Sequence, residues 1–101
     1  MEETKPLISF IIPVYNVPTA MLRECVGSIM ALSLRPFERE IIIIDDGSQN
    51  APITELGDIA DNIIYIRQRN EGVSVARNRG LLMATGRFVQ FIDNRRSEER
   101  R

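Results

Sequence analysis

Four consecutive isoleucines, Ile41–Ile44, restrict the fold of this chain more than any other feature of its sequence. Successive side chains of a β-strand point to opposite faces of the sheet, so an unbroken apolar strand has to be covered on both faces. Isoleucine is β-branched and favours strands. The run therefore predicts a central strand of a parallel sheet with helices packed against both of its faces.

Strand-like and helix-like segments alternate along the rest of the chain. Short apolar or β-branched runs indicate strands, and apolar residues spaced three and four apart indicate helices. The predicted strands are 7–12, 41–44, 63–66 and 88–92, and the predicted helices are 18–32, 53–60 and 73–84. The order βαβαβαβ predicts a three-layer α/β/α sandwich with a mostly parallel, Rossmann-like sheet.

Glycine, proline and leucine positions set the expected boundaries and faces of these elements. Pro13 is expected to close the first strand. In the last helix, Leu81 and Leu82 are expected to face the core, and Gly86 is expected to stop the helix. Residues 1–93 are predicted to form one folded unit, and the segment 94–101, which has no apolar residue, a disordered tail.

Composition excludes several classes of chemistry. The chain has 101 residues and no histidine, which excludes Ser-His-Asp catalysis and zinc sites built on histidine. Its lone cysteine, Cys25, excludes a disulfide framework. No apolar run approaches the ~20 residues that a membrane span needs, and the acidic N-terminus shows no signal-peptide pattern. We therefore expect a cytoplasmic protein without a membrane span.

Charge is distributed unevenly, although the formal net charge is only -1. Residues 1–66 hold four basic and ten acidic side chains, whereas residues 67–101 hold nine basic and four acidic ones. The arginines of the second part stand among glycines and apolar residues, which favours a small anionic ligand over a nucleic acid. Solvated helix faces carrying Arg77 and Arg79 explain the same charges equally well.

Polar and aromatic residues follow each predicted strand. Open parallel sheets bind ligands beyond the carboxyl ends of their strands, and those ends carry Tyr15, Asp45-Asp46, Arg67 and Asp93. A ring that stacks on a base, a carboxylate that accepts from a base N–H and arginines that bind a diphosphate suit a nucleotide. Structural roles remain open, since Asp46-Gly47-Ser48 also makes a good β-turn and Tyr15 also fits a half-buried edge position.

Four longer stretches carry a resemblance to a known family. They are 11–16 (IIPVYN), 41–48 (IIIIDDGS), 70–80 (NEGVSVARNRG) and 84–93 (ATGRFVQFID). In this order and spacing they resemble the N-terminal, nucleotide-sugar-binding half of family 2 glycosyltransferases, which are inverting enzymes with the GT-A fold. The resemblance implies transfer of a sugar from a nucleoside-diphosphate sugar, with UDP as the expected carrier, to an acceptor hydroxyl in glycan biosynthesis.

The same resemblance implies roles for individual residues. The tyrosine and the two residues before it would surround the uracil, and Asp46 would accept a hydrogen bond from its N3–H. Arg77 would lie beside the diphosphate, while Asp93 would contact the ribose or a divalent cation, Mn²⁺ or Mg²⁺, that bridges the phosphates. The implied substrate-binding residues are Pro13, Val14, Tyr15, Asp46, Arg77 and Asp93, with Asp93 also as the metal ligand.

The sequence departs from the family pattern after Asp93. Arg95 stands where a metal-binding carboxylate is expected, and nearby positive charge opposes the binding of a hard cation. No residue matches the family's acceptor-side catalytic base, so this truncated donor-binding half is not expected to transfer a sugar by itself. The whole enzyme is expected in the cytoplasm, with peripheral attachment to the inner face of the membrane as one arrangement.

Two other interpretations belong to different classes. A truncated sheet exposes an edge strand and an apolar flank, which predicts a non-catalytic interaction module that forms a homodimer. A receiver-like phosphoacceptor module would also place Asp45-Asp46 after a buried strand. Such a module needs a suitably placed lysine, and Lys5 is the only lysine in the chain.

Overall fold

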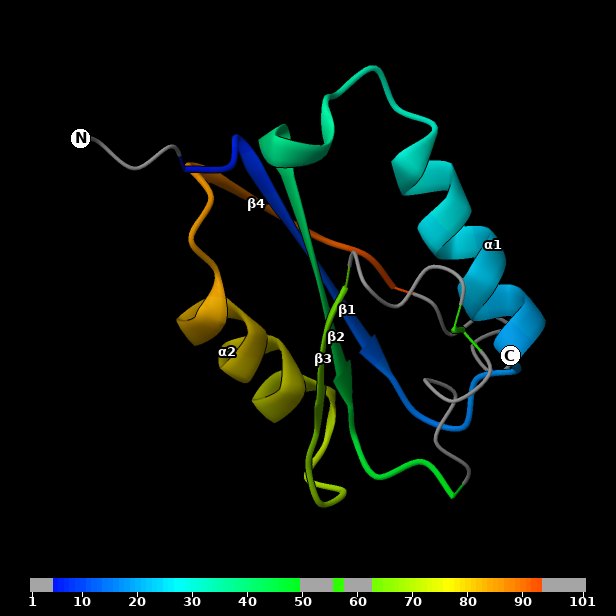
Figure 1. Cartoon of the computed structure of the whole chain (residues 1–101). Helices are drawn as coiled ribbons and strands as arrows, with labels where there is room; N and C mark the ends of the chain where they lie inside the picture. The colour runs from blue at the N-terminus through cyan, green and yellow to red at the C-terminus, as the bar shows by residue number, and fades with distance from the viewer. Residues whose placement is uncertain (1–4, 50–55, 58–62, 94–101) are drawn as a thin grey trace.

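The computed structural model describes residues 5–49, 56–57 and 63–93 and shows a sheet between two helices (Figure 1). Its elements are β1 (Ile8–Val14), α1 (Thr19–Met30), the 3₁₀ helix η1 (Pro36–Glu38), β2 (Arg39–Asp45), β3 (Ile64–Arg67), α2 (Val73–Met83) and β4 (Phe88–Phe91). The four strands form one sheet in the order β3-β2-β1-β4, and every neighbouring pair is parallel. The predicted three-layer α/β/α sandwich is confirmed.

The isoleucine run is buried on both faces of the sheet, as predicted. Ile41 and Ile43 pack in a core cluster with residues of α1, among them Leu22 and Val26. Ile42 and Ile44 pack on the other face in a second cluster with Ala76 of α2. Each of the four isoleucines is at most 2% exposed, so β2 is covered by one helix on each side.

Between Gln49 and Ile63, only Leu56 and Gly57 are described. Leu56 is fully buried and belongs to the core cluster on the α1 face. The helix predicted over 53–60 otherwise lies outside the described residues. The tail predicted over 94–101 also lies outside them, so the division of the chain at residue 93 stays a prediction.

Pro13 does not close β1, which continues to Val14 and pairs Pro13 with Ile44 of β2. The reason is the direction of the backbone groups. The Val14 carbonyl points to β2, where it accepts from the Asp46 N–H at 2.8 Å, so the nitrogen of Pro13 points to the opposite side. On that side the β4 ladder ends at Ile11, and no strand hydrogen bond is lost.

The prediction for the buried face of α2 is wrong. Leu81 is 48% exposed and Leu82 is 88% exposed, whereas Ala76 and Gly80 are buried. The helix lies so close to β1 that a Cβ atom at Gly80 would stand 2.4 Å from a methyl carbon of Ile11. Small residues therefore form the packing face, and the two leucines point away from the sheet.

The predicted ends of both helices also shift. α2 ends at Met83, three residues before Gly86, and Gly86 instead allows a close approach to β1. A Cβ atom there would stand 2.8 Å from the Ser9 backbone nitrogen, and the Gly86 N–H donates to the Ser9 hydroxyl at 2.8 Å. α1 ends at Met30, which leaves Leu32 beyond the helix and 47% exposed.

The strand order places a crevice at one edge of the sheet. The chain adds β2 and β3 on one side of β1 and then returns to add β4 on the other side. In open α/β sheets ligands bind beyond the carboxyl ends of the strands, where the strand order reverses. The reversal lies at β1, so the carboxyl ends of β1, β2 and β4 mark the expected site.

Candidate functional site

A pocket of about 160 Å³ lies at this carboxyl edge. It is lined by Pro13, Val14, Tyr15, Asp46, Asn70 and Val73. The volume is below the ~300–1,000 Å³ of a typical small-molecule site, but a cavity of ~150 Å³ is enough to hold a benzene ring. The pocket therefore suits one six-membered ring of a larger ligand.

Four of the six residues predicted to bind substrate line this pocket. Pro13 and Val14 are buried at the end of β1, and Tyr15, directly after them, is 45% exposed. Asp46 follows β2 and is 6% exposed. The arrangement combines apolar walls, an accessible aromatic ring and one carboxylate, which is what the base of a nucleotide requires.

The Asp46 carboxylate is held by three hydrogen bonds from the segment that joins β3 to α2. Its Oδ1 accepts from the Gln68 amide at 2.9 Å and from the Glu71 backbone N–H at 2.8 Å. Its Oδ2 accepts from the Gly72 backbone N–H at 3.0 Å. A carboxylate offers about four acceptor positions, so one position, on Oδ2, has no donor among these three.

Two glycines with positive φ lie in the loops around Asp46. Gly47 has a φ of 85°, and a Cβ atom there would stand 2.9 Å from the Asn70 backbone nitrogen. Gly72 has a φ of 100° and is the residue before the first turn of α2. Other residue types adopt such angles only with strain. At Gly47 the missing side chain also lets the turn after β2 meet the backbone of Asn70.

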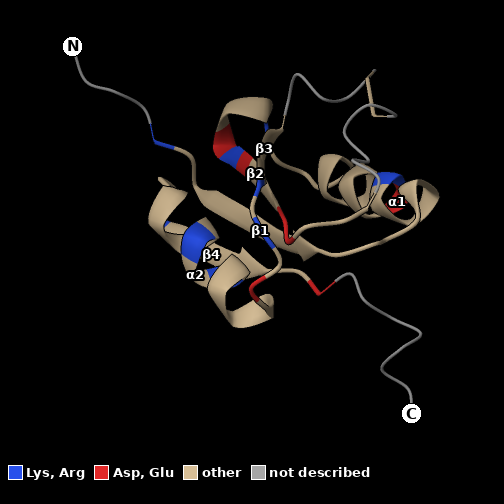
Figure 2. Ribbon diagram, turned by 90° about the horizontal axis from the view of Figure 1, so that it is seen from below, with Lys and Arg blue, Asp and Glu red and all other residues tan. Residues whose placement is uncertain are grey.

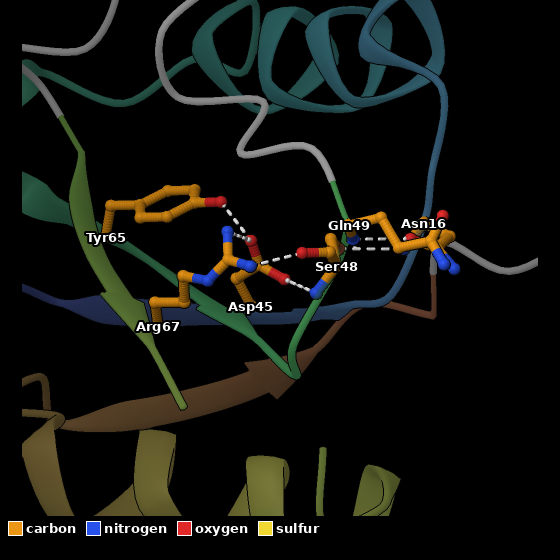
Figure 3. A network of polar contacts seen from close by, with 6 residues as sticks. All are labelled: Asn16, Asp45, Ser48, Gln49, Tyr65 and Arg67. Atoms are coloured by element: carbon orange, nitrogen blue, oxygen red, sulfur yellow. Dashed lines mark hydrogen bonds and ion pairs between the residues drawn. The ribbon is translucent and has the colours of Figure 1, made fainter. Parts of the chain in front are cut away.

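Asp45 has a structural role and does not line the pocket. Its carboxylate is fully buried in a network of polar contacts (Figure 3). It accepts from the Tyr65 hydroxyl at 2.5 Å and from the Ser48 N–H at 2.9 Å, and the Arg67 guanidinium lies 3.7 Å away. The Arg67 guanidinium also donates to the Ser48 carbonyl. These contacts fix the turn after β2.

The same turn is tied to the end of β1. The Asn16 N–H donates to the Ser48 hydroxyl at 2.8 Å, and the Gln49 N–H donates to the Asn16 side-chain oxygen at 2.9 Å (Figure 3). Asn16 has a φ of 53°, a left-handed conformation that asparagine tolerates better than most residues. The network thereby sets the spacing between the two loops that line the pocket.

Arg77 does not line the pocket but lies over β4. Its guanidinium carbon is 5.9 Å from the centroid of the Phe91 ring, a cation–π distance. Its Nε is buried and makes no hydrogen bond within the part of the chain that the structure describes. Figure 2 shows the basic positions of α2 in blue on one side of the sheet.

Asp93 lies two residues beyond β4 and is exposed. In the described ranges, no group of three or more cysteine, aspartate or glutamate side chains stands close enough to hold a metal ion. Mg²⁺ is commonly held by one or two carboxylates together with substrate phosphates. The described side chains therefore do not form a resident metal site, and Arg95 lies outside the described residues.

Sequence reasoning missed two groups that shape the pocket. Val73 lines it, and Gln68 with the backbone of Glu71 and Gly72 holds Asp46 in place. The signal for Gln68 was its position directly after β3, at the carboxyl edge of the sheet. Cys25 is not part of the site: burial raises the pKa of its thiol, and its side chain packs against the core from α1.

The fold and the pocket define a class of protein, and comparison with solved structures gives that class as GT-A glycosyltransferases. The crystal structure of S. aureus TarS superposes on this chain with a TM-score of 0.77 at 25% sequence identity. The superposition covers 87% of this chain and 16% of the TarS chain. The mannosyltransferase PcManGT from Pyrobaculum calidifontis, in complex with GDP-Man and Mn²⁺, superposes with a TM-score of 0.77 at 20% identity over 90% of this chain. The second likeness concerns the fold alone.

The family follows from the sequence. The model of the family described as Glycosyl transferase family 2 matches residues 9–94, and this chain belongs to that family. Glycosyltransferase GlyA of Streptococcus pneumoniae is 39% identical over 90 residues, and the uncharacterized glycosyltransferase YibD of Escherichia coli is 40% identical over 89. The alignments span 86% and 85% of this chain but only 12% and 25% of those relatives.

Proposed function

We propose that this chain is the donor-binding part of a glycosyltransferase and takes a nucleoside-diphosphate sugar with UDP as the carrier. The observation that carries the proposal is the pocket at the carboxyl edge, where Tyr15 and Asp46 line a space suited to one heterocyclic ring. Uracil offers one ring N–H beside two carbonyls, and Asp46 has one acceptor position to meet it. Membership of the family supports this use of the pocket.

The diphosphate would extend from the pocket toward β4. Arg77 lies there with a buried Nε that makes no hydrogen bond among the described residues, and Asp93 follows the same strand. We assign Arg77 to a phosphate oxygen and Asp93 to the ribose. No step is assigned to a cation, because the described residues hold no group of three or more carboxylate or thiol side chains that could bind one.

The reaction proposed for the whole enzyme is direct displacement. The acceptor hydroxyl attacks the anomeric carbon, the bond from that carbon to the diphosphate oxygen breaks, and the configuration inverts. A base has to take the hydroxyl proton. No residue of this chain is proposed as that base, so its contribution is binding and orienting the donor and stabilising the diphosphate as it leaves.

We place the reaction in glycan biosynthesis and in the cytoplasm. The single cysteine fits a reducing compartment, where disulfides are rare. Among the described helices, none has the length and apolar character that crossing a bilayer requires. Peripheral attachment of the whole enzyme to the inner face of the membrane is compatible with both observations.

A titration of the chain with UDP tests the proposal. We expect metal-free binding, and we expect Tyr15→Ala to weaken it about tenfold, because stacking on an aromatic ring contributes roughly 1–3 kcal/mol per base. Isothermal titration calorimetry gives both affinities. Phe37→Ala is the matched control, since Phe37 is also an exposed ring, 59% accessible, but lies in η1 away from the pocket.

The results separate several possibilities. If Phe37→Ala weakened UDP binding as much as Tyr15→Ala does, the assignment of the base to this pocket would be wrong. If UDP did not bind either with or without Mn²⁺, donor binding itself would be contradicted. Stronger binding with Mn²⁺ would show that Asp93 recruits a cation together with the diphosphate.

A second candidate function is a non-catalytic module that forms a homodimer. The observation in its favour is β4, in which all four residues are exposed, including Phe88 at 62% and Phe91 at 41%. Apolar side chains on an edge strand favour pairing with another strand.

A further inference from the structure

One of the residues that donate to Asp46, Gln68, does not line the pocket. Gln68 is 7% exposed and lies between two charged groups. Its amide nitrogen donates to Asp46 Oδ1 at 2.9 Å, and its amide oxygen faces the guanidinium of Arg79, with Nη1 at 3.5 Å. The Asp46 carboxylate requires the amide nitrogen on its side, and the Arg79 cation requires the amide oxygen on the other side. Together they fix the orientation of the Gln68 amide.

This arrangement decides how many donors Asp46 can still accept. Oδ1 already accepts two hydrogen bonds, one from Gln68 and one from the Glu71 backbone. Oδ2 accepts one, from Gly72, and keeps one position. A ligand in the pocket can therefore offer a single N–H to this carboxylate without leaving a second donor unsatisfied.

The bases of nucleotides differ in this respect. Uracil presents one ring N–H between two carbonyl oxygens. Guanine presents a ring N–H beside an exocyclic amino group, so two parallel donors meet a carboxylate and require an acceptor position on each oxygen. Cytosine presents a ring nitrogen lone pair, which a carboxylate repels.

We infer that Gln68, oriented by Arg79, is a positioning residue that makes the Asp46 site selective for uracil over guanine. Its hydrogen bond keeps Oδ1 engaged with a side chain outside the pocket, so the carboxylate cannot turn both oxygens to a base, as the two-donor contact of guanine requires. One acceptor position on Oδ2 is left for the single N–H of uracil. The inference rests on the proposed function, because it assigns the carrier specificity of the same pocket. Gln68 acts through Asp46 and makes no contact with the base.

The test compares UDP and GDP binding to the full chain by calorimetry in metal-free buffer. We expect wild type to bind UDP at least about tenfold more tightly than GDP, which corresponds to one charge-assisted hydrogen bond. Gln68→Met keeps the length of the side chain and removes its hydrogen bonds, and we expect it to reduce the ratio to about threefold or less. A purely structural role would weaken both nucleotides in proportion and leave the ratio unchanged.

Two further variants complete the design. Gln90→Met makes the same chemical change at an exposed position on β4 and should keep the wild-type ratio. Arg79→Met removes the cation that orients Gln68 and should lower the ratio in the same direction as Gln68→Met. Because Arg79 is exposed, this variant decides the question if Gln68→Met fails to fold.

The outcomes distinguish the inference from the proposed function. Wild-type binding of UDP and GDP with equal affinity would overturn the inference and leave donor binding in place. An unchanged ratio in both Gln68→Met and Arg79→Met would overturn it as well. Binding of neither nucleotide by wild type would overturn the proposed function and the inference together.

Discussion

The two aspartates after β2 are neighbours in the sequence but belong to different environments. Asp45 is the last residue of β2 and shares a face with Ile41 and Ile43, so alternation turns it toward the α1 side of the sheet. Its register partner is Arg67, and Tyr65 stands two residues earlier on the same face of β3. Asp46 lies beyond the strand and points into the pocket instead.

Asp45→Asn is therefore expected to destabilise the fold. An amide in this buried place turns a donor toward the Tyr65 hydroxyl or the Ser48 N–H, which leaves polar groups unsatisfied. We expect a loss of about 2 kcal/mol in the free energy of unfolding, measured by urea denaturation. Tyr65→Phe removes one donor from the buried carboxylate and should cost about 1 kcal/mol. An Asp45→Asn variant as stable as wild type would contradict this account of the network.

At the scale of elements, the two helices meet the sheet in different ways. α1 packs through large side chains such as Leu22, Val26 and Ile29, whereas α2 packs through Ala76 and Gly80. Large side chains hold a helix at a distance, and small ones let its backbone approach. This difference brings the start of α2 to the pocket, where Val73 lines the pocket and Gly72, just before the helix, donates to Asp46.

Glycine-to-alanine substitutions in the two helices test this difference. Gly80→Ala would put a methyl group 2.4 Å from a side-chain carbon of the fully buried Ile11, and we expect a net loss of about 1–2 kcal/mol of unfolding free energy. Gly27→Ala meets no atom within 4 Å and should gain up to about 1 kcal/mol from helix propensity. Urea denaturation measures both, and opposite signs are the required outcome.

At the scale of the whole molecule, β4 is one of the two edge strands of the described sheet, the other being β3. It pairs with β1 on one side, and all of its residues are exposed. The strand Phe88–Phe91 contains no charge and no proline, the devices by which proteins protect an edge. The relatives matched here are four to eight times longer than the aligned segment.

We expect the 101-residue chain to associate through β4 as its concentration rises. Light scattering coupled to size-exclusion chromatography measures the mass, which should increase from monomer toward dimer in the high micromolar range. Val89→Lys places a charge on the edge strand and should shift the population back to monomer. A wild-type chain that stays monomeric at every concentration would exclude β4 as a self-association surface.

Local patterns determined the layered fold and four of the six residues that line the pocket. Four adjacent isoleucines have to be buried on both faces of a strand, which requires a sheet with helices on both sides. Carboxyl ends of parallel strands share an edge, so the sequence predicts that Pro13, Val14, Tyr15 and Asp46 lie together, as they do in the pocket. Both conclusions need only the period of a strand and the direction of its ends.

Only the tertiary structure determined which face of α2 packs on the sheet and which residues donate hydrogen bonds to Asp46. Leu81 and Leu82 fit a buried face by periodicity, yet the close approach of Gly80 to Ile11 turns them outward. The donors to Asp46 come from residues 22 to 26 positions later in the chain. Such contacts depend on strand register and on the distance between α2 and the sheet. Local spacing of residue types does not carry that information, because it reports the shape of one element and not its distance from another.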